Sequence, residues 1–173
     1  MTRPRLALVT VLAVLAVVLA VLLVHAGHRR PVRDAAAAPA APVATSTDLP
    51  AAGLLRAWDE QRSMAYAEGS VPMLRDLYVA GSAAGTSDVR LLREYAARGF
   101  RVEGMRMQVL AFRVLAQRAD RVRLDVTDRL DGAVAVQPGR RVVLPRDAPS
   151  RRVMTLVRGR DGAWRVSAVA PVS

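Results

Sequence analysis

The strongest constraint on this chain is an uninterrupted apolar run near its amino terminus, from Leu6 to Val24. The run is 19 residues long, carries no charge, and has Thr10 as its one polar residue. At about 1.5 Å per helical residue it would extend roughly 28 Å, close to the thickness of the hydrocarbon core of a bilayer. We therefore predict a transmembrane helix, within a basic leader and anchor that occupy residues 1–26.

A cleaved signal peptide is the alternative interpretation of the same segment. Arg3 and Arg5 would then form its charged leader, and residues 24–26 would precede the cleavage point. Signal peptides usually have an apolar core of about 7–15 residues, and this run is longer. The length therefore favours an anchor that is retained.

The orientation of the anchor follows less directly from charge. Arg3 and Arg5 precede the apolar run, and a similar group follows it: Arg29, Arg30 and Arg33. The positive charges on the two sides of the run are nearly equal, so the positive-inside rule gives little information about orientation. A very short basic leader before an early apolar segment is typical of a signal-anchor. We therefore predict a single-pass cell-membrane protein with its domain outside the cytoplasm.

Residues 27–49 separate the anchor from the rest of the chain and include the stretch AAAAPAAPVATST. Scattered prolines and small side chains can neither bury a core nor continue a helix, so we predict a flexible linker. The chain's two histidines, His25 and His28, lie at its membrane end. Their position predicts interfacial residues, not ligands or catalysts.

Composition excludes several kinds of chemistry. The chain has no cysteine, which rules out disulfides, thiolate nucleophiles and cysteine-ligated metals. All 26 basic residues are arginine, and the formal net charge is +11. An arginine-only, alanine-rich composition is typical of a GC-rich genome, so the charge is weak support for nucleic-acid binding. We predict no metal, no cofactor and no nucleic-acid partner.

Residues 50–173 have the pattern of one folded domain that begins with three helices. The first helix ends at Gly69, the second is capped by Ser70, and the third starts at Ser87 and ends at Gly99. A Gly/Ser/Ala-rich loop is predicted at 81–85, between the second and third helices.

The pattern then changes to the two-residue period of strands. A long strand begins at Arg101; it is apolar on both faces toward its end, which predicts a central strand, and Gly104 predicts a bulge in it. Met105, Met107, Val109 and Ala111 are assigned to one face, with Leu110, Phe112 and Val114 on the other.

The second strand, 121–130, alternates between apolar and polar residues. Hairpin turns are predicted at Asp131–Gly132, Pro138–Gly139 and Asp161–Gly162, and the remaining strands near 133–137, 141–144, 151–158 and 163–170. Helices followed by an antiparallel meander predict an α+β fold.

The helical segments resemble those of the nuclear transport factor 2-like (cystatin-like) superfamily, and in particular its membrane-anchored actinobacterial members. The resemblance covers about residues 51–170 and rests on these stretches: LLRAWDEQRSMAYAEGS, VPMLRDLYVAGS and SDVRLLREYAARG. It implies a cone-shaped domain of three helices packed on a curved antiparallel sheet, with a pocket at the open end. Family members include ketosteroid isomerase, scytalone dehydratase and polyketide cyclases, and also proteins that only bind or assemble. The fold therefore does not select a function.

No residue is a strong catalytic candidate. Because the domain lacks His and Cys, acid–base chemistry would need Asp, Glu or Tyr, and the weak candidates are Asp128, Asp59 and Tyr95. Asp128 shares the inward register of its strand, but a solvated strand end is the simpler interpretation. For Asp59 the simpler interpretation is a surface ion pair with Arg62 or Arg56.

Aromatic and sulfur-containing side chains are candidates for a ligand pocket, with ordinary core packing as the alternative: Trp58, Tyr66, Tyr95, Met107 and Trp164. The tether and the absence of an acid–base cluster favour a membrane-anchored, non-enzymatic module at the cell envelope. Such a module would bind a protein partner, a second copy of itself or a small molecule. The alternative is a cone-pocket lyase, isomerase or hydrolase that uses Asp/Tyr acid–base chemistry.

Overall fold

The computed structural model describes residues 49–172. The predicted leader and span (1–26) and nearly all of the predicted linker (27–49) lie outside these residues. No helix of the described part has the length and hydropathy that a membrane crossing requires.

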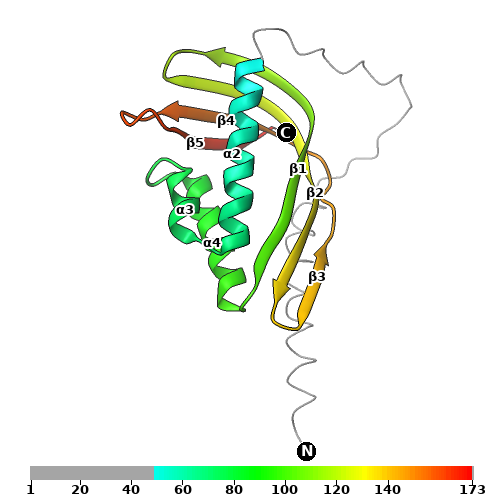
Figure 1. Cartoon of the computed structure of the whole chain (residues 1–173). Coiled ribbons are helices and arrows are strands. Elements are labelled where there is room, and N and C mark those ends of the chain that lie inside the picture. The colour runs from blue at the N-terminus through cyan, green and yellow to red at the C-terminus, as the bar shows by residue number, and fades with distance from the viewer. Residues whose placement is uncertain (1–48, 173) are drawn as a thin grey trace, which may run out of the picture. The chain divides into compact units, whose positions relative to one another are not determined.

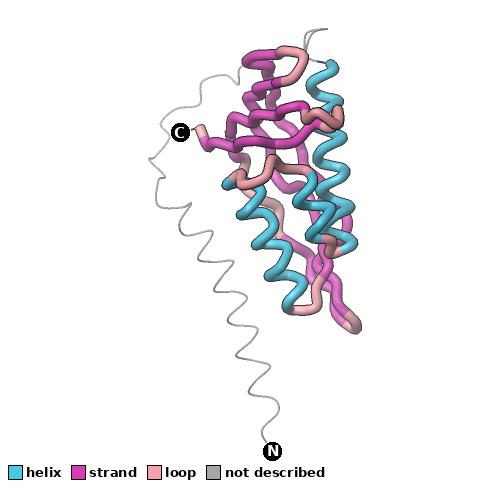
Figure 2. Tube along the Cα trace, turned by 90° about the vertical axis from the view of Figure 1, so that its left-hand side faces the viewer, coloured by secondary structure: helices cyan, strands magenta, loops and turns pink. Residues whose placement is uncertain are grey.

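The structure is α+β, with three helices and a curved antiparallel sheet of five strands in the described part (Figure 1). The helices are α2 (Leu49–Glu68), α3 (Val71–Asp76) and α4 (Ala83–Ala97). The strands are β1 (Arg101–Gln117), β2 (Arg121–Gln137), β3 (Arg140–Leu144), β4 (Ser150–Arg158) and β5 (Trp164–Pro171). The helices lie beside one another against the sheet (Figure 2).

Strand β2 is the centre of the sheet. The strand order is β1-β2-β4-β5, and β3 pairs with the far end of β2. The first half of β2 therefore lies between β1 and β4, and residues 133–137 lie between β1 and β3. The predicted alternation holds here, because Val122, Leu124 and Val126 are all buried against the helices.

Strand β1 is an edge strand, so its prediction as a central strand was wrong. It pairs with β2 alone, and its apolar residues Val109, Leu110 and Leu115 are 43%, 39% and 40% exposed. The predicted bulge at Gly104 is confirmed by a register shift and a φ of 62°. A run that is apolar on both faces is typical of a central strand, but here it belongs to an edge.

A further register shift in β1 corrects the predicted faces. Val109 pairs with Asp128, and Phe112 pairs with Val126. Because the register shifts between Val109 and Ala111, Val109 and Phe112 share the face that the prediction had divided between them.

The hairpin predicted at Asp131–Gly132 does not form, because β2 continues through it to Gln137. Gly132 pairs with Arg106 in the ladder that β2 makes with β1, and Asp131 falls at a register shift in that ladder. The predicted turns at Gly139 and Gly162 are confirmed, with φ values of 73° and 79°.

The third helix starts four residues earlier than predicted, at Ala83 instead of Ser87. Ser82 caps it, because its Oγ accepts a hydrogen bond from the Gly85 N–H. The predicted Gly/Ser/Ala loop is therefore mostly the first turn of α4. The predicted cap at Ser70 is confirmed, since its side chain accepts from the Met73 N–H.

The core fills the space between the helices and the sheet. Its fully buried apolar side chains include Leu74, Leu92, Leu124, Met154, Leu156 and Val166.

Candidate functional site

A polar network lies inside the helix layer, centred on Asp88 of α4. The Asp88 carboxylate accepts from Arg62 Nε and Nη2, both at 2.6 Å, and from the hydroxyls of Tyr66 and Tyr78, both at 2.7 Å. Each carboxylate oxygen therefore has two donors, and all four side chains of this group are largely buried. We call these residues the Asp88 network.

Electrostatics favour the ionised form of this carboxylate. Burial raises the pKa of Asp88, but hydrogen bonds and charge from Arg62, with the tyrosine hydroxyls, outweigh burial and hold that pKa below its ordinary value. Burial and the nearby Asp88 charge raise the pKa of Tyr66 and Tyr78, so both remain protonated donors. The Asp88 network is thus a fully satisfied structural tie between α2, the end of α3 and α4.

Aromatic rings surround the buried guanidinium. Arg62 Cζ lies 5.9 Å from the ring centroid of Trp58 and 5.1 Å from that of Tyr66. Trp58 also meets Tyr78 edge to face, with centroids 5.7 Å apart, and its indole N–H donates to the Leu77 carbonyl. Trp58 and Tyr66, both predicted as pocket walls, are therefore packed in the core around Arg62.

A second group of buried charges consists of Asp59 of α2, Asp128 of β2 and Arg152 of β4, which interact through their charges. Asp128 is 0% exposed, and its Oδ2 accepts from Arg152 Nη2. Asp59 Oδ1, Asp128 Oδ1 and Arg152 Nε are buried without a hydrogen-bond partner among residues 49–172. Burial raises the pKa of Asp59 to about 6. The nearby Arg62 and Arg152 charges lower this pKa in part, whereas the Asp128 charge raises it further. Burial likewise raises the pKa of Asp128.

The structure corrects the simpler interpretation of both carboxylates. Asp128 is not a solvated strand end, because β2 continues past it and the helices cover it. Asp59 does not pair with Arg62 or Arg56. Arg62 is held by Asp88, and Arg56 lies 3.7 Å from Glu60, one helical turn away on an exposed face.

The other predicted site residues do not join this group. Tyr95 lies half-buried near the end of α4, where burial raises its pKa. Met107 is opposite Leu130 in the β1–β2 ladder. Trp164, at the start of β5, lines a groove of about 430 Å³ with Pro50 and other residues near the start of α2.

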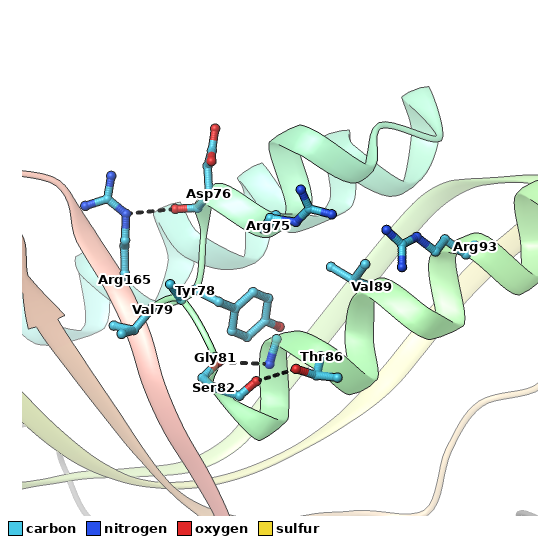
Figure 3. A pocket seen from close by; sticks show the side chains of 12 residues that line it. Arg75, Asp76, Tyr78, Val79, Gly81, Ser82, Thr86, Val89, Arg93 and Arg165 are labelled. Atoms are coloured by element: carbon cyan, nitrogen blue, oxygen red, sulfur yellow. Dashed lines mark hydrogen bonds between the residues drawn. The ribbon is translucent and has the colours of Figure 1, made fainter.

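A larger groove of about 480 Å³ lies where α3, the start of α4 and β5 meet (Figure 3). We call it the α3–α4 groove, and its lining includes Arg75, Tyr78, Ser82, Val89, Arg93 and Arg165. Asp59 and Asp128 line neither this groove nor the smaller one.

Sequence reasoning missed the α3–α4 groove. It placed a loop at 81–85, whereas α4 begins at Ala83 with Ser82 as its cap. The start of this helix brings Ser82 and Thr86 to the groove wall. Arg75 and Arg93 stand among many arginines, and no local pattern distinguishes them.

No group of three or more His, Cys, Asp or Glu side chains within residues 49–172 is arranged to hold a metal ion.

No protein-family profile matches the chain, and no curated protein matches it in sequence. Several solved structures are similar to part of the chain. The intermembrane space region of the chloroplast protein ARC6 is 14% identical over 76% of this chain and 99% of its own, with a TM-score of 0.48. Aln2 from a Streptomyces species is 14% identical over 70% of this chain and 90% of its own, with a TM-score of 0.46. A domain of unknown function with a cystatin-like fold, from Nostoc punctiforme, is 16% identical over 73% of this chain and 76% of its own, with a TM-score of 0.42.

Proposed function

We propose that this protein is a membrane-tethered binding module that takes its ligand in the α3–α4 groove. The observation that carries the proposal is the lining of the groove. Guanidinium, hydroxyl and apolar groups face it, and guanidinium groups bind ligands but do not exchange protons near neutral pH. The carboxylate of Asp76 points away from Arg75 and Arg93 (Figure 3), and the Tyr78 hydroxyl is held by Asp88.

The positions of the interior carboxylates give less support to acid–base catalysis. Asp88 has all its acceptor positions filled by Arg62, Tyr66 and Tyr78. Asp59 and Asp128 retain oxygens without donors, but a molecule in either groove would not meet them. A lyase, isomerase or hydrolase that used these carboxylates would need a substrate path that neither groove provides.

The tether is part of the same proposal. The apolar run Leu6–Val24 would serve as a signal-anchor, and residues 27–49 as a spacer that holds the domain outside the cytoplasm. This organisation is that of a membrane-anchored actinobacterial member of the nuclear transport factor 2-like superfamily. A module of this kind needs an accessible groove, and the α3–α4 groove opens at the domain surface.

The test is a fragment screen on the full chain in phosphatidylcholine nanodiscs, read by ligand-observed NMR. Ala80 is exposed and lines the groove, so Ala80→Trp should fill it and abolish fragment binding. Ala148→Trp, in an exposed loop away from the groove, is the matched control and should leave binding unchanged. Fragments that bind equally well to the Ala80→Trp protein, or a screen without hits, would refute the groove as the binding site.

A further inference from the structure

We propose that the α3–α4 groove recognises a phosphate monoester carried on an apolar body, with Arg75 and Arg93 holding the phosphate. This inference rests on the proposed function, because it assigns a ligand class to the same groove.

Two guanidinium groups converge at one end of the groove without an ion-pair partner among the described residues. Arg75 of α3 and Arg93 of α4 point toward each other across the groove (Figure 3). Neither side chain forms an ion pair or a hydrogen bond with any part of the chain between residues 49 and 172. Two like charges on facing helices repel each other, and an anion between them relieves that repulsion.

The third arginine of the groove is already engaged. Arg165 donates through Nη1 and Nη2 to the Asp161 carboxylate, at 3.0 and 2.6 Å, and through Nε to the Asp76 carbonyl at 3.2 Å. Asp76 also lines the groove, but its carboxylate points away from Arg75 and Arg93 (Figure 3). The unmatched positive charge of the groove therefore lies at the end occupied by these two arginines.

Charge and shape then select the ligand group. A phosphate monoester carries about 1.5–2 negative charges near pH 7, which matches two guanidinium groups. Each planar guanidinium can donate two parallel hydrogen bonds to phosphate oxygens. A carboxylate brings one charge and would leave one arginine uncompensated.

The rest of the groove fits an apolar body. Val89 lies on α4 between Arg93 and Ser82, with the Tyr78 ring facing the groove from the other side (Figure 3). Ser82 and Arg93 lie roughly 16 Å apart along the helix axis, at about 1.5 Å per residue. The groove is thus long enough for a phosphate at one end and a ring or short alkyl chain beside Val89.

Two sources would supply this chemistry: a soluble phosphate monoester, or the headgroup of phosphatidic acid in the membrane. The probe for the shared site is phenyl phosphate, titrated into the full chain in phosphatidylcholine nanodiscs and followed by calorimetry. We expect it to bind more tightly than inorganic phosphate or benzyl alcohol, since each of these offers one half of the ligand.

The variants locate the site. Arg75→Gln and Arg93→Gln should each weaken phenyl phosphate binding at least tenfold. Both side chains are exposed, so thermal unfolding should change little. Arg90→Gln is the matched control, because Arg90 is exposed on the same helix but does not line the groove. Its binding should equal that of the wild type.

A second arm separates the sources. If phosphatidic acid in the nanodisc competes with phenyl phosphate and Arg75→Gln removes the competition, the lipid headgroup is the ligand. If phenyl phosphate binds and phosphatidic acid does not compete, the soluble ester is the ligand. Both outcomes support the phosphate site.

Two results would overturn the inference: no binding of phenyl phosphate, or binding that Arg75→Gln and Arg93→Gln leave unchanged. If fragments still bind to the wild type and not to Ala80→Trp, the proposed function survives and the ligand class is wrong. If Ala80→Trp abolishes no binding of any kind, the groove itself is wrong.

Discussion

Asp88 and Asp59 are both buried aspartates, but the pKa values of their carboxylates shift in opposite directions. Asp88 is buried with four hydrogen-bond donors, so its charge is compensated and its pKa is lowered. Asp59 is buried with one oxygen unpartnered among residues 49–172, and its pKa rises to about 6. Burial acts on both groups, and the number of donors decides the direction of each shift.

The raised pKa of Asp59 predicts a particular pH dependence of stability. Its pKa in the fold, about 6, lies above the ordinary 3.8, so the folded state binds more protons than the unfolded state between these values. The free energy of unfolding should therefore fall as pH rises from about 4 to about 6. Asp59→Asn should remove this contribution and make the variant more stable than the wild type at pH 7.5.

Urea unfolding of both proteins at several pH values between 4 and 7.5 measures this difference. Titration of carboxylates that do not interact with Asp59 acts on both proteins alike and cancels in the comparison. Parallel stability profiles over this range would show that Asp59 titrates normally and that its burial has no electrostatic cost.

At the residue scale, sequence reasoning recovered part of the polar interior. It singled out Asp128 by strand register and Asp59 as a weak candidate. It judged Asp128 to be at a solvated strand end and Asp59 to be in a surface ion pair. Arg62 and Asp88 are 26 positions apart, and their pairing depends on how α2 and α4 pack. No local pattern in the sequence indicates such a contact.

At the scale of elements, the predictions succeeded where local chemistry decides. Ser70 capped its helix and Gly139 formed its turn, because a hydroxyl cap and a positive φ are properties of a few neighbouring residues. They failed at Gly132, where pairing with β1 overrides the turn propensity of Asp-Gly. They also failed at the start of α4, because Gly85 looks like a loop residue in sequence.

Gly85 has a packing role that predicts an unusual helix substitution. Alanine normally stabilises a helix relative to glycine. At Gly85, however, an added Cβ would lie 2.7 Å from the Cβ and Cγ of Tyr78. We predict that Gly85→Ala destabilises the domain by about 1–3 kcal/mol because of this clash.

Gly53 in α2 provides the matched control, since an added Cβ there meets nothing within 4 Å. Gly53→Ala should raise the free energy of unfolding by about 0.5–1 kcal/mol. Chemical denaturation of the two variants tests both signs at once. A stabilised Gly85→Ala protein would mean that α4 and Tyr78 are not in close contact.

At the scale of the whole molecule, the α+β order followed from the sequence pattern and the curved sheet from the family resemblance, whereas the position of β1 was predicted wrongly. The order of helices and strands depends on local periodicity, which is visible along the chain. The place of a strand within a sheet depends on its neighbouring strands. Strand β1 carries apolar residues on both faces although it has only one neighbouring strand, β2. The membrane span from Leu6 to Val24 lies outside the described residues and stays a prediction.

The orientation of the chain can be tested with a single introduced cysteine, because the natural sequence has none. Ala148 lies in an exposed loop between β3 and β4. We predict that Ala148→Cys reacts with a membrane-impermeant maleimide in intact cells, since the anchor would place the domain outside the cytoplasm. The size of the labelled band distinguishes a retained anchor from a cleaved one.

The cysteine-free wild type gives the background of this experiment, and lysed cells give the full signal. Labelling that requires lysis would reverse the predicted orientation, and a soluble phosphate monoester of the cytoplasm would then be the first ligand to try.

The interrupted register of β1 has a consequence for crowded conditions. A long, regular edge can template the next copy of a chain, and repetition of that step produces open-ended aggregates. Here the ladder shifts around Gly104, at 109–111 and at 114–116, so no long stretch of β1 offers evenly spaced donors and acceptors. The apolar side chains of Val109, Leu110 and Leu115 remain exposed beside these shifts. Strand β1 is therefore a poor template for the addition of a further strand.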